Sequence, residues 1–196
     1  MSDVPILPSN LKRSYPRVLR LDRGVEVAVR WMTSLDVHRI VAFARALPER
    51  DLQFLRVDIT RMLAVMLWVQ NINAGKTMTL LAEKNGELAG YASLHNDQVS
   101  WQRHLGELRV QVGAPWRGLG LGQALAREIF AVAPEMGLKK IVGQMPPGQT
   151  QAISLLERAG FKQEAVLHGF VIDRTGHTSD LVVMTCDVDA LPRAPD

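Results

Sequence analysis

The sequence predicts a single α/β domain (α+β in some schemes), in which helices flank a mixed and mostly antiparallel sheet. Several short segments alternate apolar with polar residues, which is typical of half-buried strands. Other segments repeat their apolar residues every three or four positions, as amphipathic helices do. The chain has 196 residues, of which 47% are hydrophobic and 22% charged, so one domain can bury its own core.

The first elements follow an extended segment. Residues 1–23 are rich in proline and in basic residues, and they show little periodicity, which predicts an extended lead-in. Valines at alternate positions predict a strand over 24–32. Apolar residues at helical spacing predict one helix over 34–47 and a second over 58–73.

From Thr77 the apolar period changes to two. Asn85-Gly86 lies between two such runs in 77–96, and this dipeptide is a strong hairpin signal. A strand–helix–strand unit follows, which predicts a parallel pair with a right-handed crossover. The segments from there on are a strand at 105–113, a helix ending near 133, a strand at 139–145, a helix at 150–160, and strands at 161–173 and 177–188 that turn at 174–176.

Composition limits the function. We expect a lead-in at 1–23, one domain at 24–188 and a flexible tail at 189–196. The net charge is only +3 and no basic run is interleaved with aromatic residues, so we expect no nucleic-acid partner. No secretory signal and no run of about 20 apolar residues is present, so we expect a cytoplasmic protein without a membrane partner. The single cysteine, Cys186, fits a reducing compartment.

Glycines alternate at the entrance of the helix that follows residue 120. They are Gly118, Gly120 and Gly122. Glycine lets a ligand approach the backbone closely, and the first amides of a helix have no intrahelical acceptor. The helix dipole adds roughly half a positive charge at this end. This stretch therefore predicts a site for a phosphate or pyrophosphate.

Two common nucleotide signatures do not match this stretch. A phosphate loop needs Lys and then Ser or Thr after its last glycine, whereas Gly122 is followed by Gln123 and Ala124. A dinucleotide fingerprint that starts at Gly118 needs glycine at position 123. The pattern that remains is R-x-x-G-x-G, which starts at Arg117 and stands between a strand and a helix.

This pattern resembles the acyl-CoA pyrophosphate motif of the GNAT N-acetyltransferase superfamily. The predicted order of elements over 24–188 is similar to that of the family, and "AISLLERAGF" at 152–161 resembles its late helix. The resemblance implies a GNAT-like fold whose central parallel strands splay apart to admit acetyl-CoA. It also implies N-acetyl transfer from acetyl-CoA to a primary amine.

The resemblance assigns acetyl-CoA contacts by position. Backbone groups next to the pantetheine arm are implied at Val110, Gln111 and Val112. Pyrophosphate contacts are implied from the amides of Gly118, Leu119, Gly120, Leu121, Gly122 and Gln123. The Arg117 side chain adds charge there or packs away.

Amine acetylation needs a proton acceptor, because an amine with a pKa of about 10.4 is protonated near neutral pH. Glu107 matches the general-base position of bacterial protein-lysine acetyltransferases in the superfamily, and "ALPERDLQFLR" at 46–56 also resembles those enzymes. We expect Glu107 to receive the amine proton, directly or through a water, and the Val110 N–H to stabilise the thioester oxygen.

The sequence departs from the ribosomal-protein alanine acetyltransferases of the superfamily. Their late helix resembles N-x-x-A-x-x-L-Y, with a tyrosine that protonates the thiolate. Here Gln149 stands at the asparagine position, Leu156 at the tyrosine position, and Gln144 replaces a glutamate base. Gln149 remains a candidate for cofactor binding by position. A non-catalytic acyl-CoA-binding or regulatory module is therefore the alternative function.

Other features point away from additional chemistry. The histidines lack metal-ligand spacing, so we expect no metal. We expect His95 at the surface or in a hairpin, and Tyr91 in the core. The helix over 60–71 carries more apolar surface than one core face needs, which predicts cover from a second subunit or from the N-terminal segment. The amine acceptor stays open among a protein lysine, a protein N-terminus, a small amine and an antibiotic.

Overall fold

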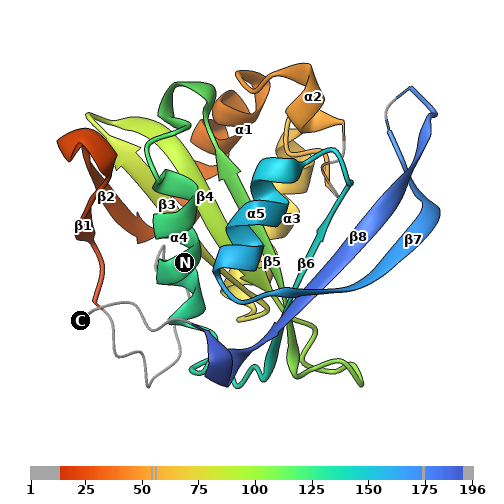
Figure 1. Ribbon diagram of the computed structural model, residues 1–196. Coiled ribbons are helices and arrows are strands. Elements are labelled where there is room, and N and C mark those ends of the chain that lie inside the picture. Colours follow the sequence, from red (N-terminus) through yellow and green to blue (C-terminus); the bar gives the residue numbers. More distant parts are fainter. Residues whose placement is uncertain (1–13, 54, 56, 174, 192–196) are drawn as a thin grey trace.

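One mixed sheet of eight strands runs through the part of the protein that the computed structural model describes, residues 14–53, 55, 57–173 and 175–191. The spatial order of the strands is β1-β2-β3-β4-β5-β6-β8-β7, so the chain adds each strand beside the last until the final pair exchanges places (Figure 1). Residues 1–13 and 192–196, and Arg174 of the predicted turn, lie outside the described residues.

The strands follow the alternating segments of the sequence. They are β1 (Arg17–Arg20), β2 (Glu26–Trp31), β3 (Thr77–Lys84), β4 (Glu87–His95), β5 (Leu105–Val112), β6 (Lys140–Met145), β7 (Lys162–Ile172) and β8 (Thr178–Asp187). The helices are α1 (Val37–Arg45), α2 (Glu49–Leu52), α3 (Met62–Asn73), α4 (Leu121–Phe130) and α5 (Thr150–Arg158). Short 3-10 helices are η1 (Asp22–Gly24), η2 (Ser34–Asp36), η3 (Ala114–Trp116) and η4 (Val188–Ala190).

Helices cover both faces of the sheet. On one face, α4 and α5 pack with Leu80, Leu94 and Ile141 in one apolar cluster. On the other face, α1 and α3 pack with Leu81 and Tyr91 in a second cluster. The two clusters take alternate residues of the same strands, because successive side chains of a strand point to opposite faces.

The sheet opens in its middle. All contacts between neighbouring strands are antiparallel except the parallel pair β5–β6. That pair is short: only Leu105–Glu107 of β5 faces residues of β6, from Lys140 to Val142. Beyond Glu107 the two strands diverge, while β5 stays paired with β4 as far as Val112. The predicted mixed sheet with splayed parallel strands is confirmed.

Local signals explain where boundaries differ from the prediction. The helix expected from residue 58 begins at Met62, because the Asp58 carboxylate accepts hydrogen bonds from the N–H and hydroxyl of Thr60 and closes a turn there. Residues 17–20 of the predicted lead-in pair with β2 as an edge strand. Leu191, which the prediction places in the tail, is buried after η4.

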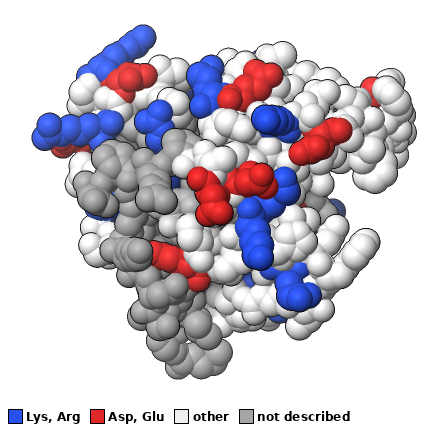
Figure 2. Space-filling model, turned by 60° about the horizontal axis from the view of Figure 1, so that its bottom comes forward, with Lys and Arg blue, Asp and Glu red and all other residues white. Residues whose placement is uncertain are grey.

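Within the described residues, no helix is long and apolar enough to cross a membrane. The same residues form no group of three or more His, Cys, Asp or Glu side chains that could hold a metal ion. Figure 2 shows basic and acidic side chains intermixed over the face that it draws.

Candidate active site

The glycine stretch forms the entrance of α4. Gly118 has φ +70° and Gly120 has φ +77°, and both values lie in the left-handed region that favours glycine. Gly122 has a different role, since a Cβ built there would lie 3.3 Å from Leu155 Cδ1. Two of the glycines therefore shape the turn, and the third lets α4 approach α5.

The amides at the start of α4 come before the first hydrogen bond of the helix. The first helical hydrogen bond of α4 runs from Ala124 N–H to the carbonyl of Gly120, at 3.0 Å. Among the described residues, the amides of Leu121, Gly122 and Gln123 have no hydrogen-bond acceptor. Three N–H groups at the positive end of a helix can bind a phosphate oxygen. The residues present therefore fit a pyrophosphate group.

Asp22 of η1 lies beside the turn. Its N–H donates to the carbonyl of Leu119 at 3.2 Å, and a Cβ built on Gly120 would lie 3.2 Å from its Oδ2. Any side chain at position 120 would therefore meet both an unfavourable φ and this carboxylate. The close approach of η1 adds a second reason for glycine here.

Arg117 packs back against β5 and α2. Its Nε and Nη2 each donate to the carbonyl of Val112 at 3.2 Å, and Nη2 also pairs with the Asp51 carboxylate. The sequence left open whether the Arg117 side chain adds charge at the turn or packs away, and in the structure it packs away. The sequence gives no sign that Asp51 pairs with Arg117, because 66 residues separate the two partners.

The backbone of β5 presents alternate residues to the opening. The N–H of Gly113 donates to the carbonyl of Ala89, which belongs to β4, at 2.9 Å. The two-residue alternation of a strand then turns the backbone of Val110 and Val112 toward the opening, and that of Gln111 toward β4. Of the three residues predicted to contact pantetheine, Val110 and Val112 thus turn their backbone to the opening, where the Val112 carbonyl already accepts from Arg117, and Gln111 turns its backbone to β4.

Glu107 lies where the strands part. It faces His95 across the antiparallel pair and Val142 across the last parallel pair. Its Oε1 accepts a hydrogen bond of 3.0 Å from Arg109 Nε, and its side chain is 23% exposed. The alternation along β5 sends the side chains of Glu107 and Arg109 to the face that α3 covers, away from Leu108 in the α4 cluster.

A pocket of about 340 Å³ lies on this face between α3 and β4–β5. Its apolar walls include Leu55, Val57, Ile59, Leu67, Trp68 and Tyr91. Its polar lining is Asn71, His95 and Arg109. The sequence predicts Tyr91 in the core. In the structure its side chain is only 4% exposed, as a core residue is, and it also lines the pocket.

The polar atoms of the pocket's aromatic residues are neutral or already bonded. Trp68 Nε1 donates to Thr79 Oγ1 at 3.1 Å. Burial raises the pKa of Tyr91 to about 12, although the nearby Arg109 charge acts in the opposite direction. The phenol is therefore neutral at physiological pH, and among the described lining residues Arg109 is the one that is always charged.

Of the two places predicted for His95, the surface or a hairpin, the structure has the second, since His95 pairs with Thr77 across the β3–β4 hairpin and is partly buried. Its Nδ1 lies 3.0 Å from Thr77 Oγ1 and its Nε2 lies 2.8 Å from Ser93 Oγ. Its ring stands beside Trp68, with the centroids 6.2 Å apart. His95, Trp68 and Arg109 were missed because they come from three elements that only the strand register brings together.

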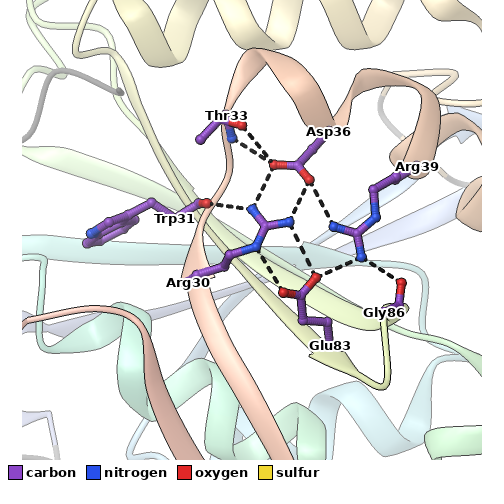
Figure 3. A network of polar contacts seen from close by, with 7 residues as sticks. All are labelled: Arg30, Trp31, Thr33, Asp36, Arg39, Glu83 and Gly86. Carbon is purple, nitrogen blue, oxygen red and sulfur yellow. Dashed lines mark hydrogen bonds and ion pairs between the residues drawn. The ribbon is translucent and has the colours of Figure 1, made fainter. Parts of the chain in front are cut away.

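A network of charges fastens α1 and the β3–β4 hairpin on the same face (Figure 3). Arg30 donates to both carboxylate oxygens of Asp36 at 2.8 and 2.7 Å, and its Nε donates to Glu83 at 3.0 Å. Arg39 bridges the same two carboxylates, at 3.2 Å to Asp36 and 2.7 Å to Glu83. This network holds the scaffold of the pocket rather than lining it.

The network shifts the carboxyl groups toward their charged forms. Burial by itself raises the pKa of Asp36, but hydrogen bonds from Arg30 and Thr33 outweigh it and hold this pKa below its ordinary value. Burial likewise raises the pKa of Glu83, but hydrogen bonds from Arg30 and Arg39 lower it by more, so the pKa of Glu83 lies below its ordinary value. Both carboxylates are thus ionised at neutral pH.

The remaining candidates belong to α5 and to its N-cap. Gln149 is the N-cap residue and is exposed, and its side chain makes no capping hydrogen bond. Leu156 is only 4% exposed and belongs to the core. Position 156 therefore supplies packing and no acidic hydroxyl.

The described residues thus join two sites through one opening. Unbonded amides lie at the α4 entrance, and Val110 faces the gap. Glu107 and the pocket lie on the face of α3. An extended ligand anchored by a phosphate at α4 can present its far end to a base on the opposite face.

Comparison with known proteins gives one family and many similar structures. The model of the acetyltransferase (GNAT) family matches residues 50–161. A GNAT-family acetyltransferase from Streptococcus pneumoniae has a TM-score of 0.72 at 23% identity, over 82% of this chain and 99% of that one. Ribosomal-protein-alanine N-acetyltransferase from Brucella melitensis has a TM-score of 0.70 at 24% identity, over 81% and 98%. YncA from Salmonella typhimurium, solved with its cofactor acetyl-CoA, has a TM-score of 0.71 at 21% identity, over 87% and 98%.

Proposed function

The chain belongs to the acetyltransferase (GNAT) family, and from this premise we propose that it transfers an acetyl group from acetyl-CoA to a primary amine. The observation that carries the proposal is the opening between β5 and β6, with a row of unbonded amides at one side and Glu107 at the other. A thioester that enters this opening from the α4 side meets an amine that enters from the α3 side.

Each group has a defined part in this proposal. The amides of residues 118–123 bind the pyrophosphate, and the opening receives the pantetheine arm. Acetyl-CoA supplies an activated acyl group whose carbonyl the amine attacks directly. The Val110 N–H stabilises the negative charge that develops on the carbonyl oxygen, and Glu107 takes the amine proton directly or through a water.

The leaving thiolate needs a different partner from a tyrosine at position 156. Leu156 is buried, so α5 offers no phenol there. We propose that water supplies this proton. The missing phenol also favours the alternative of a non-catalytic acyl-CoA-binding module, which would bind the ligand without turnover.

A thiol-release assay separates these two functions. The full chain is incubated with acetyl-CoA and a panel of primary amines, and free CoA is measured against an amine-free blank. Catalysis predicts amine-dependent release of CoA together with the acetylated amine in equal amount. Binding of acetyl-CoA by calorimetry without any such release would leave the binding module as the function.

Assembly and location are further parts of this proposal. Met62, Leu63, Met66 and Leu67 of α3 are between 41% and 68% exposed in the described chain. We propose that a second subunit covers part of this face, as an apolar surface of this kind favours. A light-scattering mass of one chain at micromolar concentration would argue against it. The single Cys186 supports a cytoplasmic location.

A further inference from the structure

The pocket on the face of α3 carries an arginine whose terminal nitrogens are not used. Arg109 donates from Nε to Glu107 at 3.0 Å, and its Nη1 and Nη2 make no hydrogen bond to any described residue. Its side chain is 28% exposed and lines the pocket, so these donors are open to a ligand. A guanidinium presents two parallel N–H groups that match a carboxylate.

The same strand places an opposite charge two residues away. Glu107 and Arg109 lie on one face of β5, and the carboxylate lies nearer to the parallel pair with β6. In the proposed reaction Glu107 takes the proton of the amine. A molecule whose amine lies at Glu107 therefore has any anionic group on an adjacent carbon within reach of Arg109.

The rest of the pocket is apolar and of limited size. Its volume of about 340 Å³ is at the low end for small-molecule sites. Trp68 and Tyr91 pack edge to face with ring centroids 5.0 Å apart, and the indole N–H is already bonded to Thr79. These walls offer carbon surface to an aliphatic or aromatic group, and the described lining residues include no carboxylate for a second cation.

From these contacts we propose that the acceptor is a free α-amino acid, or a close analogue, with an apolar or aromatic side chain. This inference rests on the proposed amine acetylation. The amino group lies at Glu107, the carboxylate pairs with the Arg109 fork, and the side chain fills the α3 pocket. Polyamines and lysine-rich peptides are poor acceptors, because Arg109 repels an additional positive charge at this position.

Matched acceptors test the role of the carboxylate. Phenylalanine, phenylalanine amide and phenethylamine share the ring and the amine, and only the first carries the anion. We expect kcat/KM for phenylalanine to exceed that for phenethylamine by roughly 10- to 100-fold, as hydrogen bonds between charged groups suggest. Spermidine should be the poorest acceptor. Equal rates for phenylalanine and phenethylamine would overturn the proposal.

Variants assign the preference to Arg109. Arg109→Gln should raise KM for phenylalanine by a much larger factor than KM for phenethylamine, because only phenylalanine carries the carboxylate that pairs with the fork. Arg109→Lys keeps the charge without the fork and should retain part of the preference. Arg103→Gln removes an exposed arginine outside this pocket and is the matched control. An Arg109→Gln variant that keeps the full preference would sink the proposal.

Direct binding separates this inference from the proposed function. Phenylalanine is titrated by calorimetry into the full chain saturated with CoA, with phenethylamine as the comparison. Amine acetylation without any carboxylate preference overturns the amino-acid acceptor and leaves the acetyltransferase intact. Selective binding of phenylalanine without acetylation of any amine instead overturns the catalytic function and retains the ligand class.

Discussion

The α4 side and the α3 side of the opening are built from different parts of the chain. On the α4 side, the proposed ligand groups are backbone amides within residues 118–123, shaped by two glycines with positive φ. On the α3 side they are side chains such as Trp68, Tyr91 and Arg109, which come from three separate elements. A backbone site can thus be contained in one short stretch, whereas a side-chain site exists only after the strands have aligned.

This difference predicts opposite sensitivities to substitution. On the α4 side, a change matters when it alters the path of the backbone, and the identity of a neighbouring side chain counts little. On the α3 side, removing one charged or hydrogen-bonding group changes the chemistry while the backbone stays in place.

Gly120→Val should abolish acetyl-CoA binding. The φ of +77° is unfavourable for a β-branched residue, and the new Cβ would lie 3.2 Å from Asp22 Oδ2, so the turn must move away from its phosphate-binding shape. Calorimetry with acetyl-CoA measures the loss. Gly137→Val has a similar φ of +71° with open space around it, away from the turn, and serves as the control for backbone strain. Unchanged affinity in Gly120→Val would refute the backbone site.

Glu107→Gln should lower turnover by about 10²- to 10⁴-fold, the usual worth of general-base catalysis. The amide keeps the size and polarity of the side chain but removes its basicity, so acetyl-CoA affinity should stay nearly constant. Part of the rate should return at high pH, where more of the amine is unprotonated. Glu26→Gln is a matched control, because Glu26 is also a strand glutamate paired with an arginine, at 2.9 Å, far from the opening. Full turnover at neutral pH would show that Glu107 is not the base.

Asp36→Asn should destabilise the α3 side without touching the α4 side. The Asp36 side chain is only 3% exposed and accepts from two arginines, whereas Arg30 and Arg39 are partly exposed to solvent. Removing one partner of a buried ion pair costs about 3–5 kcal/mol, and solvent screening of the arginines reduces this to about 2 kcal/mol. Urea unfolding measures it. Asp187→Asn breaks an exposed pair with Lys140 and should change the midpoint little. Equal midpoints for the two variants would contradict a stabilising role of the network.

Acid should weaken the wild-type protein more steeply than the Asp36→Asn variant. The folded protein lowers the pKa of Asp36 and of Glu83 from their ordinary values of 3.8 and 4.5, so the unfolded chain binds more protons in acid. The stabilisation is complete above these ordinary values and is lost as the pH falls through and below them. Urea midpoints measured between pH 7 and pH 3 test this. Parallel curves for the two proteins would assign the acid sensitivity to other groups.

The order of elements was predictable because its signals are local. The period of two around Asn85-Gly86 and the glycines before α4 each act within a few residues, and the fold has the predicted hairpin at the first and the predicted start of a helix at the second. The edge strand Arg17–Arg20 was not predicted as a strand, because its pairing with β2 is a tertiary contact. Helix α2 is a single turn and carries no period.

Of the residues on the α3 side, the sequence predicts a functional role for Glu107 alone. Arg109 lies opposite Ser93 and Glu107 opposite His95, and this register depends on the path of the chain through residues 96–104. The Arg117–Asp51 pair likewise joins two distant segments. Composition and periodicity carry no information on such contacts, so the pocket emerged only with the structure.

The early end of the β5–β6 pairing has a consequence for amide hydrogen exchange. Val110 and Val112 have no partner residue in β6, so their N–H groups lack the ladder bonds that protect amides in a sheet. Arg109 and Gln111, which alternate with them, face β4 and are paired. In deuterated water the free protein should therefore show fast and slow amides in alternation along a single central strand. Pantetheine bound in the opening should slow the fast amides and leave the slow ones as they were.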